Sequence, residues 1–216
     1  MAPMAAARIA VMLVDDHAVV RMGFRLLIEA APDMRVVAEA ESGEDAVRAI
    51  EEARADVVVL DISMPGIGGL EAVHRIVARA PQARILVLSA HEDALHARRV
   101  LKAGAAGYLT KRSAAEALIE AIREVFQGRS FLEPQIARQL EHQRGAHADP
   151  LERLSEKEFK VFLALAGGQS VQDIAAVMSL SPSTVGTHLY NIKQKLGAAN
   201  SAELALIAMR AGLLTP

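Results

Sequence analysis

The sequence predicts two domains: a parallel α/β domain with helices on both faces of a five-stranded sheet, and a smaller all-helical domain behind it. Three observations carry this prediction. Five short β-branched runs alternate with five longer helical patterns over residues 8–128. The runs are almost continuously apolar, which is typical of parallel strands buried on both faces. Beyond residue 150 only helical patterns with clear start signals remain.

The elements of the first domain follow one another in a fixed order. Each apolar run leads through a polar or glycine-containing loop into a helical pattern. We expect strands at 9–14, 35–40, 56–60, 84–89 and 106–110, and helices at about 18–31, 43–53, 69–80, 93–103 and 113–127. Such repeated units connect by right-handed crossovers, which place helices on both sides of the sheet.

The composition excludes several classes of protein. With 216 residues, 52% of them hydrophobic, the chain can build two small domains with real cores. The absence of cysteine excludes disulfides, thiolate metal sites and cysteine nucleophiles. With 3% aromatic residues and no Trp, a base-stacking platform for single-stranded nucleic acid is not expected. No apolar run reaches the ~18–20 residues of a membrane span, and no signal peptide is recognisable, so we expect a cytoplasmic protein.

Charge and periodicity divide the chain. Residues 1–128 carry a net charge of −3, residues 129–150 of 0 and residues 151–216 of +1, which sum to −2. The slightly basic tail permits DNA binding without arguing strongly for it. We expect a first domain at 8–128, a linker at 129–150 with one helix near 134–143 and a flexible join at 144–150, and a second domain at 151–216.

Polar side chains follow four of the five expected strands. In chain order they are Asp15, Asp16, His17, Asp61, Ser89 and Lys111. Because the carboxyl ends of parallel strands meet at one edge of a sheet, where such sheets bind ligands, these groups should converge. Whether Glu39 and Glu41, at the end of the second strand, join them depends on the order of the strands.

A cluster of this kind needs a cation. Two carboxylates ~4 Å apart repel by ~4 kcal/mol at an effective dielectric constant near 20, and three repel more. Oxygen ligands without a need for His or Cys favour Mg²⁺, which partners with phosphate oxygens. A metal ion, an ammonium group and a hydroxyl around one carboxylate are what phosphoryl transfer onto it requires. Each residue alone fits an ordinary surface ion pair; the set together favours a phosphoryl-transfer site.

Four sequence segments resemble the receiver domain of bacterial two-component response regulators: LVDDH at 13–17, LDISMPGIGGLE at 60–71, LSA at 88–90 and GYLTK at 107–111. The resemblance covers residues 8–128 and implies a flavodoxin-like, doubly wound fold. It also implies that Asp61 is the phosphoacceptor.

The same resemblance implies roles for the other residues of this edge. Mg²⁺ would be held by Asp15, Asp16, Asp61 and the backbone carbonyl of Ser63. Lys111 and Ser89 would meet the phosphoryl group. Tyr108 would be the switch aromatic, turning inward when Ser89 moves toward the phosphate.

Two positions depart from the family pattern. Gly68 stands where an Asp is common, so the loop after Asp61 should have more freedom. Arg112 follows Lys111 in place of a frequent proline, which argues against the usual cis peptide bond there. Neither change removes a reacting group.

The tail contains four helical patterns with start signals. Ser155 with Glu158 forms a capping box, Ser170 with Asp173 caps a second helix, and Ser181 with Pro182 opens a third that ends before Gly197. Asn200 with Glu203 frames a fourth, to about residue 211. The second and third helices are joined by a short turn, which is helix-turn-helix spacing, although two capped helices with a tight turn also occur in ordinary bundles.

The third of these helices has one apolar and one polar face. Val185, Leu189, Ile192 and Leu196 form the apolar stripe. Small or hydrogen-bonding side chains suited to base edges lie opposite it: Ser183, Thr187, Tyr190, Asn191 and Gln194. Thr184, Lys193 and Lys195 flank this face, where they would reach DNA phosphates. We therefore expect this helix to read the major groove of duplex DNA.

The tail as a whole resembles the LuxR-type helix-turn-helix domain of NarL/FixJ regulators. The matching segments lie within residues 151–214. The resemblance implies four helices, with the last used in dimer packing. Gly186 stands where a Lys is frequent in the family, so a long cationic side chain is lost from the DNA-facing surface.

These observations favour a cytoplasmic transcriptional response regulator. A histidine kinase or a small phosphodonor would phosphorylate Asp61 with Mg²⁺, and this would favour a homodimer that binds duplex DNA. Two alternatives remain at this point. One is a Mg²⁺ phosphatase with an aspartyl-phosphate intermediate, although such enzymes usually carry a second acid two residues after the nucleophile, where this chain has Ser63. The other is a regulator that acts through protein contacts alone.

Overall fold

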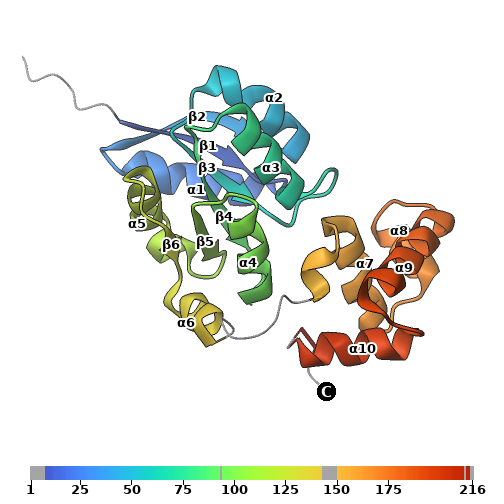
Figure 1. The fold of residues 1–216 in the computed structure, drawn as a ribbon. Coiled ribbons are helices and arrows are strands. Elements are labelled where there is room, and N and C mark those ends of the chain that lie inside the picture. The colour runs from blue at the N-terminus through green and yellow to red at the C-terminus, as the bar shows by residue number, and fades with distance from the viewer. Residues whose placement is uncertain (1–7, 93, 143–149, 212, 215–216) are drawn as a thin grey trace, which may run out of the picture. The chain divides into compact units, whose positions relative to one another are not determined.

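The computed structural model describes residues 8–92, 94–142, 150–211 and 213–214, and the chain divides into two compact units, Met1–Arg144 and Gly145–Pro216 (Figure 1). The first unit contains a six-stranded parallel sheet in the order β2-β1-β3-β4-β5-β6. The strands are β1 (Ile9–Val14), β2 (Met34–Ala40), β3 (Val57–Asp61), β4 (Arg84–Ser89), β5 (Gly107–Thr110) and β6 (Phe131–Leu132). The predicted parallel α/β class is confirmed, with one strand more than expected.

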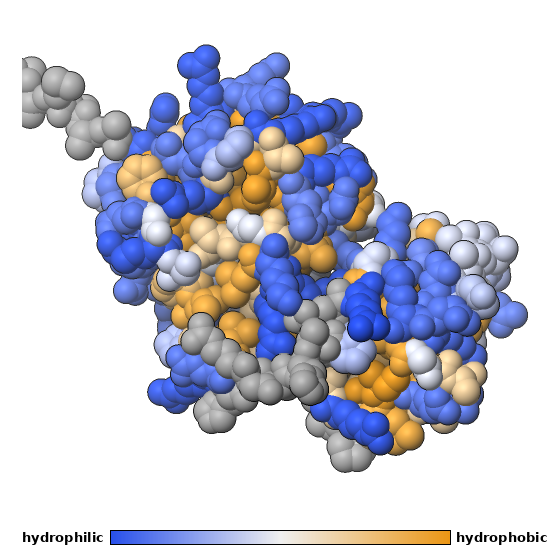
Figure 2. Space-filling model, viewed as in Figure 1, coloured by the Kyte–Doolittle hydropathy of each residue, from blue (hydrophilic) through white to orange (hydrophobic). Residues whose placement is uncertain are grey.

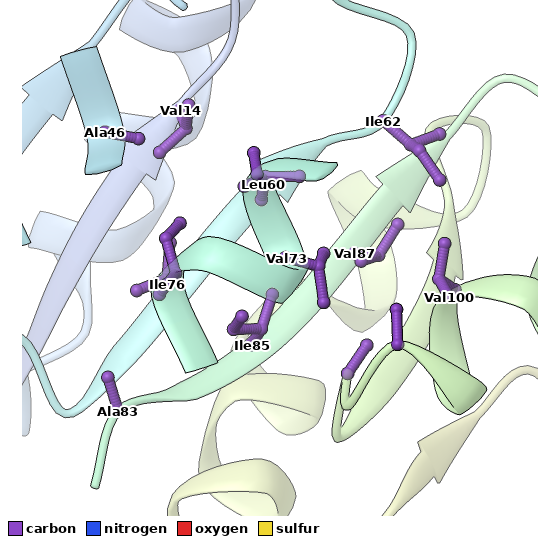
Figure 3. Packing of buried hydrophobic residues seen from close by; sticks show 14 of the residues in the cluster. Val14, Ala46, Leu60, Ile62, Val73, Ile76, Ala83, Ile85, Val87 and Val100 are labelled. Carbon is purple, nitrogen blue, oxygen red and sulfur yellow. The ribbon is translucent and has the colours of Figure 1, made fainter. Parts of the chain in front are cut away.

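Helices cover both faces of this sheet, as the apolar strand runs predicted. They are α1 (Ala18–Ala30), α2 (Gly43–Ala53), α3 (Gly69–Arg79), α4 (Ala94–Lys102), α5 (Ala114–Phe126) and α6 (Pro134–His142). One hydrophobic cluster lies between the sheet and α1 and α5, and the other between the sheet and α2, α3, α4 and α6. In the second cluster, strand residues Leu60 and Ile85 lie close to Val73 and Ile76 of α3 (Figure 3).

The extra strand lies in the segment expected to be a linker. Gly107 and Tyr108 of β5 pair in parallel with Phe131 and Leu132 of β6, and α6 follows two residues later. Ile136 of α6 is only 1% exposed and belongs to the cluster under α4. Residues 131–142 are therefore part of the first unit. A two-residue strand has too little alternation for a sequence pattern to reveal it. The expected flexible join lies largely outside the described residues.

The second unit consists of η1 (Pro150–Arg153), α7 (Glu156–Ala166), α8 (Val171–Val177), α9 (Pro182–Leu196) and α10 (Ser201–Arg210). All four predicted caps are present, and the capping boxes of Ser155 with Glu158 and of Ser170 with Asp173 are complete on both sides. Gly197 ends α9 with φ of +67°, a conformation that glycine adopts at little cost.

Polar and charged residues occupy most of the outer part of the visible face of each unit, and hydrophobic residues emerge between them (Figure 2). Among the described residues, no helix has both the length and the apolar character that crossing a membrane requires.

Candidate functional site

The acids that end β1 and β3 meet at the carboxyl edge of the sheet. β1 and β3 are hydrogen-bonded neighbours, so Asp15, directly after β1, lies beside Asp61, the last residue of β3. Ligand atoms of Asp15, Asp16, His17 and Asp61 all lie within 4.8 Å of one another. Asp61 is fully buried and Asp15 is 3% exposed. The predicted convergence of the two strand ends is confirmed.

Lys111 bridges the two buried carboxylates. Its Nζ lies 2.8 Å from Asp15 Oδ2 and 2.8 Å from Asp61 Oδ2, while the backbone N–H of Ser63 donates to Asp61 Oδ1 at 2.9 Å. Burial raises the pKa of Asp61, and the hydrogen bonds from Lys111 and Ser63 only partly offset this. Burial alone would lower the pKa of Lys111, but its bonds to Asp15 and Asp61 outweigh burial and raise it. One ammonium group therefore binds two of the three carboxylates that cluster at this edge.

The remaining excess of negative charge suits a divalent cation. Asp15, Asp16 and Asp61 supply clustered carboxylate oxygens, which hard cations such as Mg²⁺ and Ca²⁺ prefer. The ring of His17 is 66% exposed, with Nδ1 2.9 Å from Asp16 Oδ1, so it lies in position to orient that carboxylate. These residues could together hold a metal ion.

Glu39 and Glu41 stay outside the acid cluster, although β2 lies next to β1. Arg21 of α1 binds both of them, from Nε to Glu39 Oε2 at 3.0 Å and from Nη2 to Glu41 Oε1 at 2.9 Å. Its third contact is a hydrogen bond from Nη1 to the backbone carbonyl of Asp15 at 2.6 Å. Sequence reasoning missed Arg21, for which the available signal was an arginine in the first turn of a mostly apolar helix.

Ser89 and Tyr108 both bind the backbone of His91. Ser89 is fully buried at the end of β4, and its Oγ accepts from the N–H of His91 at 3.0 Å. The hydroxyl of Tyr108 donates to the carbonyl of His91 at 2.7 Å. Tyr108 is completely buried in the cluster that contains Ile136 of α6. The inward position expected only after activation is thus already occupied, because β6 and α6 complete the core around it.

The loop after Asp61 is held from α2. Glu44 Oε1 accepts from the N–H of Ile67 at 2.9 Å, a contact that the sequence analysis missed. Gly68 directly precedes α3 and has φ of +81°. The backbone freedom expected of this glycine therefore allows the turn that leads into α3. A Cβ on Gly69 would lie 2.4 Å from the Cα of Ile62, so no larger residue fits there. The Lys111–Arg112 peptide bond is trans, as predicted.

In the second unit, α8 and α9 form a helix-turn-helix with Ser179 in the turn at φ of +54°. Four of the five side chains expected to read bases are exposed along α9, with Tyr190 65% exposed, whereas Val185 and Ile192 are buried. Exposed on this face are Ser183, Thr184, Thr187, Tyr190 and Gln194; Gly186, Asn191, Lys193 and Lys195 are partly covered.

Lys195 has a partner that the sequence analysis did not foresee. Its Nζ lies 2.5 Å from Oε2 of Glu158, which is 4% exposed and also closes the capping box of α7. Burial would raise the pKa of Glu158, but the hydrogen bonds from Lys195 and Ser155 outweigh it and lower that pKa. Lys195 therefore ties α9 to α7.

A doubly wound domain with a buried acid–lysine edge, followed by a helix-turn-helix unit, defines a signal-responsive DNA-binding regulator. Residues 11–123 match the family described as response regulator receiver domain, and residues 152–208 match the bacterial regulatory proteins of the luxR family. The chain belongs to the response regulators, in the NarL/FixJ group with a LuxR-type DNA-binding domain. It is thus a transcriptional regulator of the two-component class and not a dedicated enzyme.

Relatives cover both units. The chain is 40% identical over 209 residues to the response regulator GacA of Pseudomonas aeruginosa, covering 95% of this chain and 98% of that protein. A LuxR-family response regulator from Aurantimonas is 40% identical with a TM-score of 0.62, covering 65% of this chain and all of the other. A structure of two RcsB dimers bound to two parallel DNAs is 27% identical with a TM-score of 0.59, covering 96% of this chain and all of the other.

Proposed function

We propose that Asp61 receives a phosphoryl group from a partner histidine kinase or a small phosphodonor. One observation carries this proposal: the buried Asp61 carboxylate lies 2.8 Å from Lys111 Nζ and within one acid cluster with Asp15 and Asp16. An oxygen of Asp61 forms the new bond to phosphorus, and the bond from phosphorus to the donor breaks with its electron pair leaving on the donor. Lys111 lies close enough to neutralise charge on the transferring group.

Asp15, Asp16 and Asp61 would hold Mg²⁺, together with the backbone carbonyl of Ser63. When bound, the ion would offset the negative charge of the carboxylates and the phosphoryl oxygens. Arg21 keeps the Asp15 segment in place through its hydrogen bond to the Asp15 carbonyl. The N–H of Ser63 donates to one Asp61 oxygen and so fixes the orientation of the carboxylate. The same edge would slowly hydrolyse its own acyl phosphate.

The phosphoryl group would act through its charge of about −2. Lys111 and the Ser89 hydroxyl would move to meet it, and the backbone of His91 would follow because Ser89 and Tyr108 both bind there. We propose that this shift favours a homodimer, as the DNA-bound RcsB dimers support.

The output is binding to duplex DNA by α9. Base edges would be read by Ser183, Thr187, Tyr190, Asn191 and Gln194, with Gly186 at the groove; phosphates would be bound by Thr184, Lys193 and Lys195. One DNA-binding unit carries a net charge of only +1 and should bind DNA weakly on its own. A dimer on paired half-sites would compensate for this. The regulator would act in the cytoplasm, the compartment that holds bacterial DNA.

Labelling with radioactive acetyl phosphate and Mg²⁺ tests the phosphoacceptor. Wild-type protein should take up label in an acid-stable, alkali-labile form, and Asp61→Asn should take up none while keeping its circular dichroism spectrum. Asp45→Asn, which replaces a half-exposed carboxylate in the first turn of α2, is the matched control and should be labelled like the wild type. Normal labelling of Asp61→Asn would end the assignment.

A further inference from the structure

Glu133 connects the turn that carries Lys111, residues 110–113, to the segment between β6 and α6. It lies between β6 and α6, and its carboxylate reaches the turn between β5 and α5. Oε1 accepts from the hydroxyl of Ser113 at 2.7 Å, and Oε2 accepts from the backbone N–H of Thr110 at 3.2 Å. These two partners directly flank Lys111 and Arg112. A single carboxylate therefore holds both ends of the turn.

The other side of that turn faces the acid cluster. Lys111 extends its Nζ to Asp15 and Asp61, and its backbone N–H donates to the carbonyl of Ser89 at 2.8 Å. The lysine is thus placed by the main chain on one side and by Glu133 on the other. A shift of the turn would move Nζ away from both carboxylates.

The backbone of Glu133 also takes part in the first turn of α6. Its carbonyl accepts from the N–H of Ala137 at 2.9 Å in the first turn of that helix. Ile136 is buried in one cluster with Tyr108 and Val100, and Leu140 packs against the same cluster. The residue that grips the Lys111 turn therefore also starts a helix that shares a core with the proposed switch tyrosine.

The side chain of Ser113 is bound between Thr110 and Glu133. This residue occupies the N-cap position of α5, yet its side chain makes no capping hydrogen bond there. Its hydroxyl donates to Glu133 and accepts from the hydroxyl of Thr110 at 3.3 Å. Burial would raise the pKa of Glu133, but the bonds from Ser113 and Thr110 and the charge of Arg112 outweigh it and lower that pKa. The carboxylate is therefore ionised and accepts from both donors.

We propose that Glu133 is a positioning residue for Lys111 and that it couples the phosphorylation of Asp61 to helix α6. The proposal rests on the function proposed above, since it concerns the same phosphoacceptor. Recruitment of Lys111 by a phosphoryl group pulls on Thr110 and Ser113, and Glu133 carries this displacement to the start of α6. Linkage makes the effect reciprocal, so whatever stabilises α6 in its docked position also alters phosphorylation.

Acetyl phosphate labelling of the full-length chain tests the positioning role. Glu133→Ala should slow labelling by about tenfold, since small misplacements near a reacting group have large effects. Glu133→Gln should keep most of the rate, because its amide oxygen accepts from Thr110 while the rotatable hydroxyl of Ser113 accepts from the amide nitrogen. Glu124→Ala is the matched control: it removes a partly exposed carboxylate bound to Arg129 and should label normally.

Hydrogen exchange with and without acetyl phosphate tests the coupling. In the wild type, exchange in residues 134–142 should change on phosphorylation; in Glu133→Ala it should not respond. Ser113→Ala should slow labelling in the same direction, and combining it with Glu133→Ala should add little, as for two partners of one contact. This milder variant also carries the test if Glu133→Ala does not fold.

The outcomes separate the two proposals. A wild type that takes no label overturns the proposed function itself. A labelled wild type together with unaffected Glu133→Ala and Ser113→Ala variants overturns the positioning role alone. Full additivity of the two substitutions in labelling also overturns the positioning role, because Glu133 then does not act through Ser113. An unchanged exchange response of α6 in Glu133→Ala overturns the coupling.

Discussion

Arg21 donates a hydrogen bond from Nη1 to the backbone carbonyl of Asp15 at 2.6 Å, and so a buried cation of α1 holds the segment that carries the proposed metal ligands. The same guanidinium binds Glu39 and Glu41 and keeps them out of the acid cluster. A planar group with five donors suits three acceptors in different directions, which an ammonium group on a flexible stem does not.

Arg21→Lys should therefore weaken the site while leaving its carboxylates in place. The lost bonds should lower the free energy of unfolding by about 1–3 kcal/mol and weaken Mg²⁺ binding, because the Asp15 segment loses its support. Thermal unfolding and Mg²⁺ titration calorimetry measure the two effects. Arg25→Lys is the matched control, since Arg25 also binds Glu39 but is half exposed. Equal Mg²⁺ affinity of Arg21→Lys and the wild type would contradict this role.

Asp61→Asn should stabilise the metal-free protein at pH 7. Burial raises the pKa of Asp61 above its usual value of 3.8. The folded state then holds a proton that the unfolded state has lost, so stability falls as pH rises from the unfolded toward the folded pKa, and the whole penalty is present above it. The melting temperature should rise by a few degrees at pH 7, and the gain should shrink toward pH 4. A loss of stability at pH 7 would contradict the prediction.

Lys193 and Lys195 should differ when each is replaced by Ala. Because both lysines are proposed phosphate contacts, each substitution should weaken binding to any duplex. Each should also reduce the slope of log affinity against log salt concentration by about one unit. Only Lys195→Ala should also lower the free energy of unfolding, by about 1–2 kcal/mol, because it leaves the buried Glu158 without its cation. Fluorescence anisotropy at several salt concentrations and thermal unfolding check both parts. An unchanged salt slope would remove the lysine concerned from the phosphate contacts.

Gly186→Ala should stabilise the second unit and weaken DNA binding. In the described part of the chain nothing lies within 4 Å of the position that a Cβ on Gly186 would take, so no close packing there requires a glycine. Alanine in the helix should add up to about 1 kcal/mol of stability. DNA affinity should fall because the methyl group meets the DNA backbone or groove.

Gly23→Ala provides the control for this experiment. Gly23 lies inside α1 with nothing near its Cβ position, so alanine should stabilise the first unit to a similar extent without changing DNA affinity. Unchanged DNA binding by Gly186→Ala would mean that the groove does not approach this position.

Sequence patterns predicted what depends on local order. The apolar runs predicted β1 to β5, the Ser and Asn caps predicted the start of each helix in the second unit, and the position of Asp61 directly after a buried strand predicted its place at the sheet edge. Contacts between distant segments were not accessible in this way. Glu44 with the Ile67 loop, Lys195 with Glu158, and Glu133 with the Ser113 turn join residues whose spacing follows no helical or strand period. The inward position of Tyr108 likewise depends on α6, which sequence reasoning had assigned to the linker.

β6 is only two residues long, yet it pairs with the outer flank of β5 and so affects how another chain could approach this edge. Gly107 and Tyr108 are already paired in parallel with Phe131 and Leu132, and the N–H of Thr110 donates to Glu133, so this flank of β5 has little free backbone for a foreign strand. Two residues are too few to template another ribbon in turn. A subunit that approaches from this side therefore meets helices and side chains, so this edge of the sheet offers little to open-ended strand pairing.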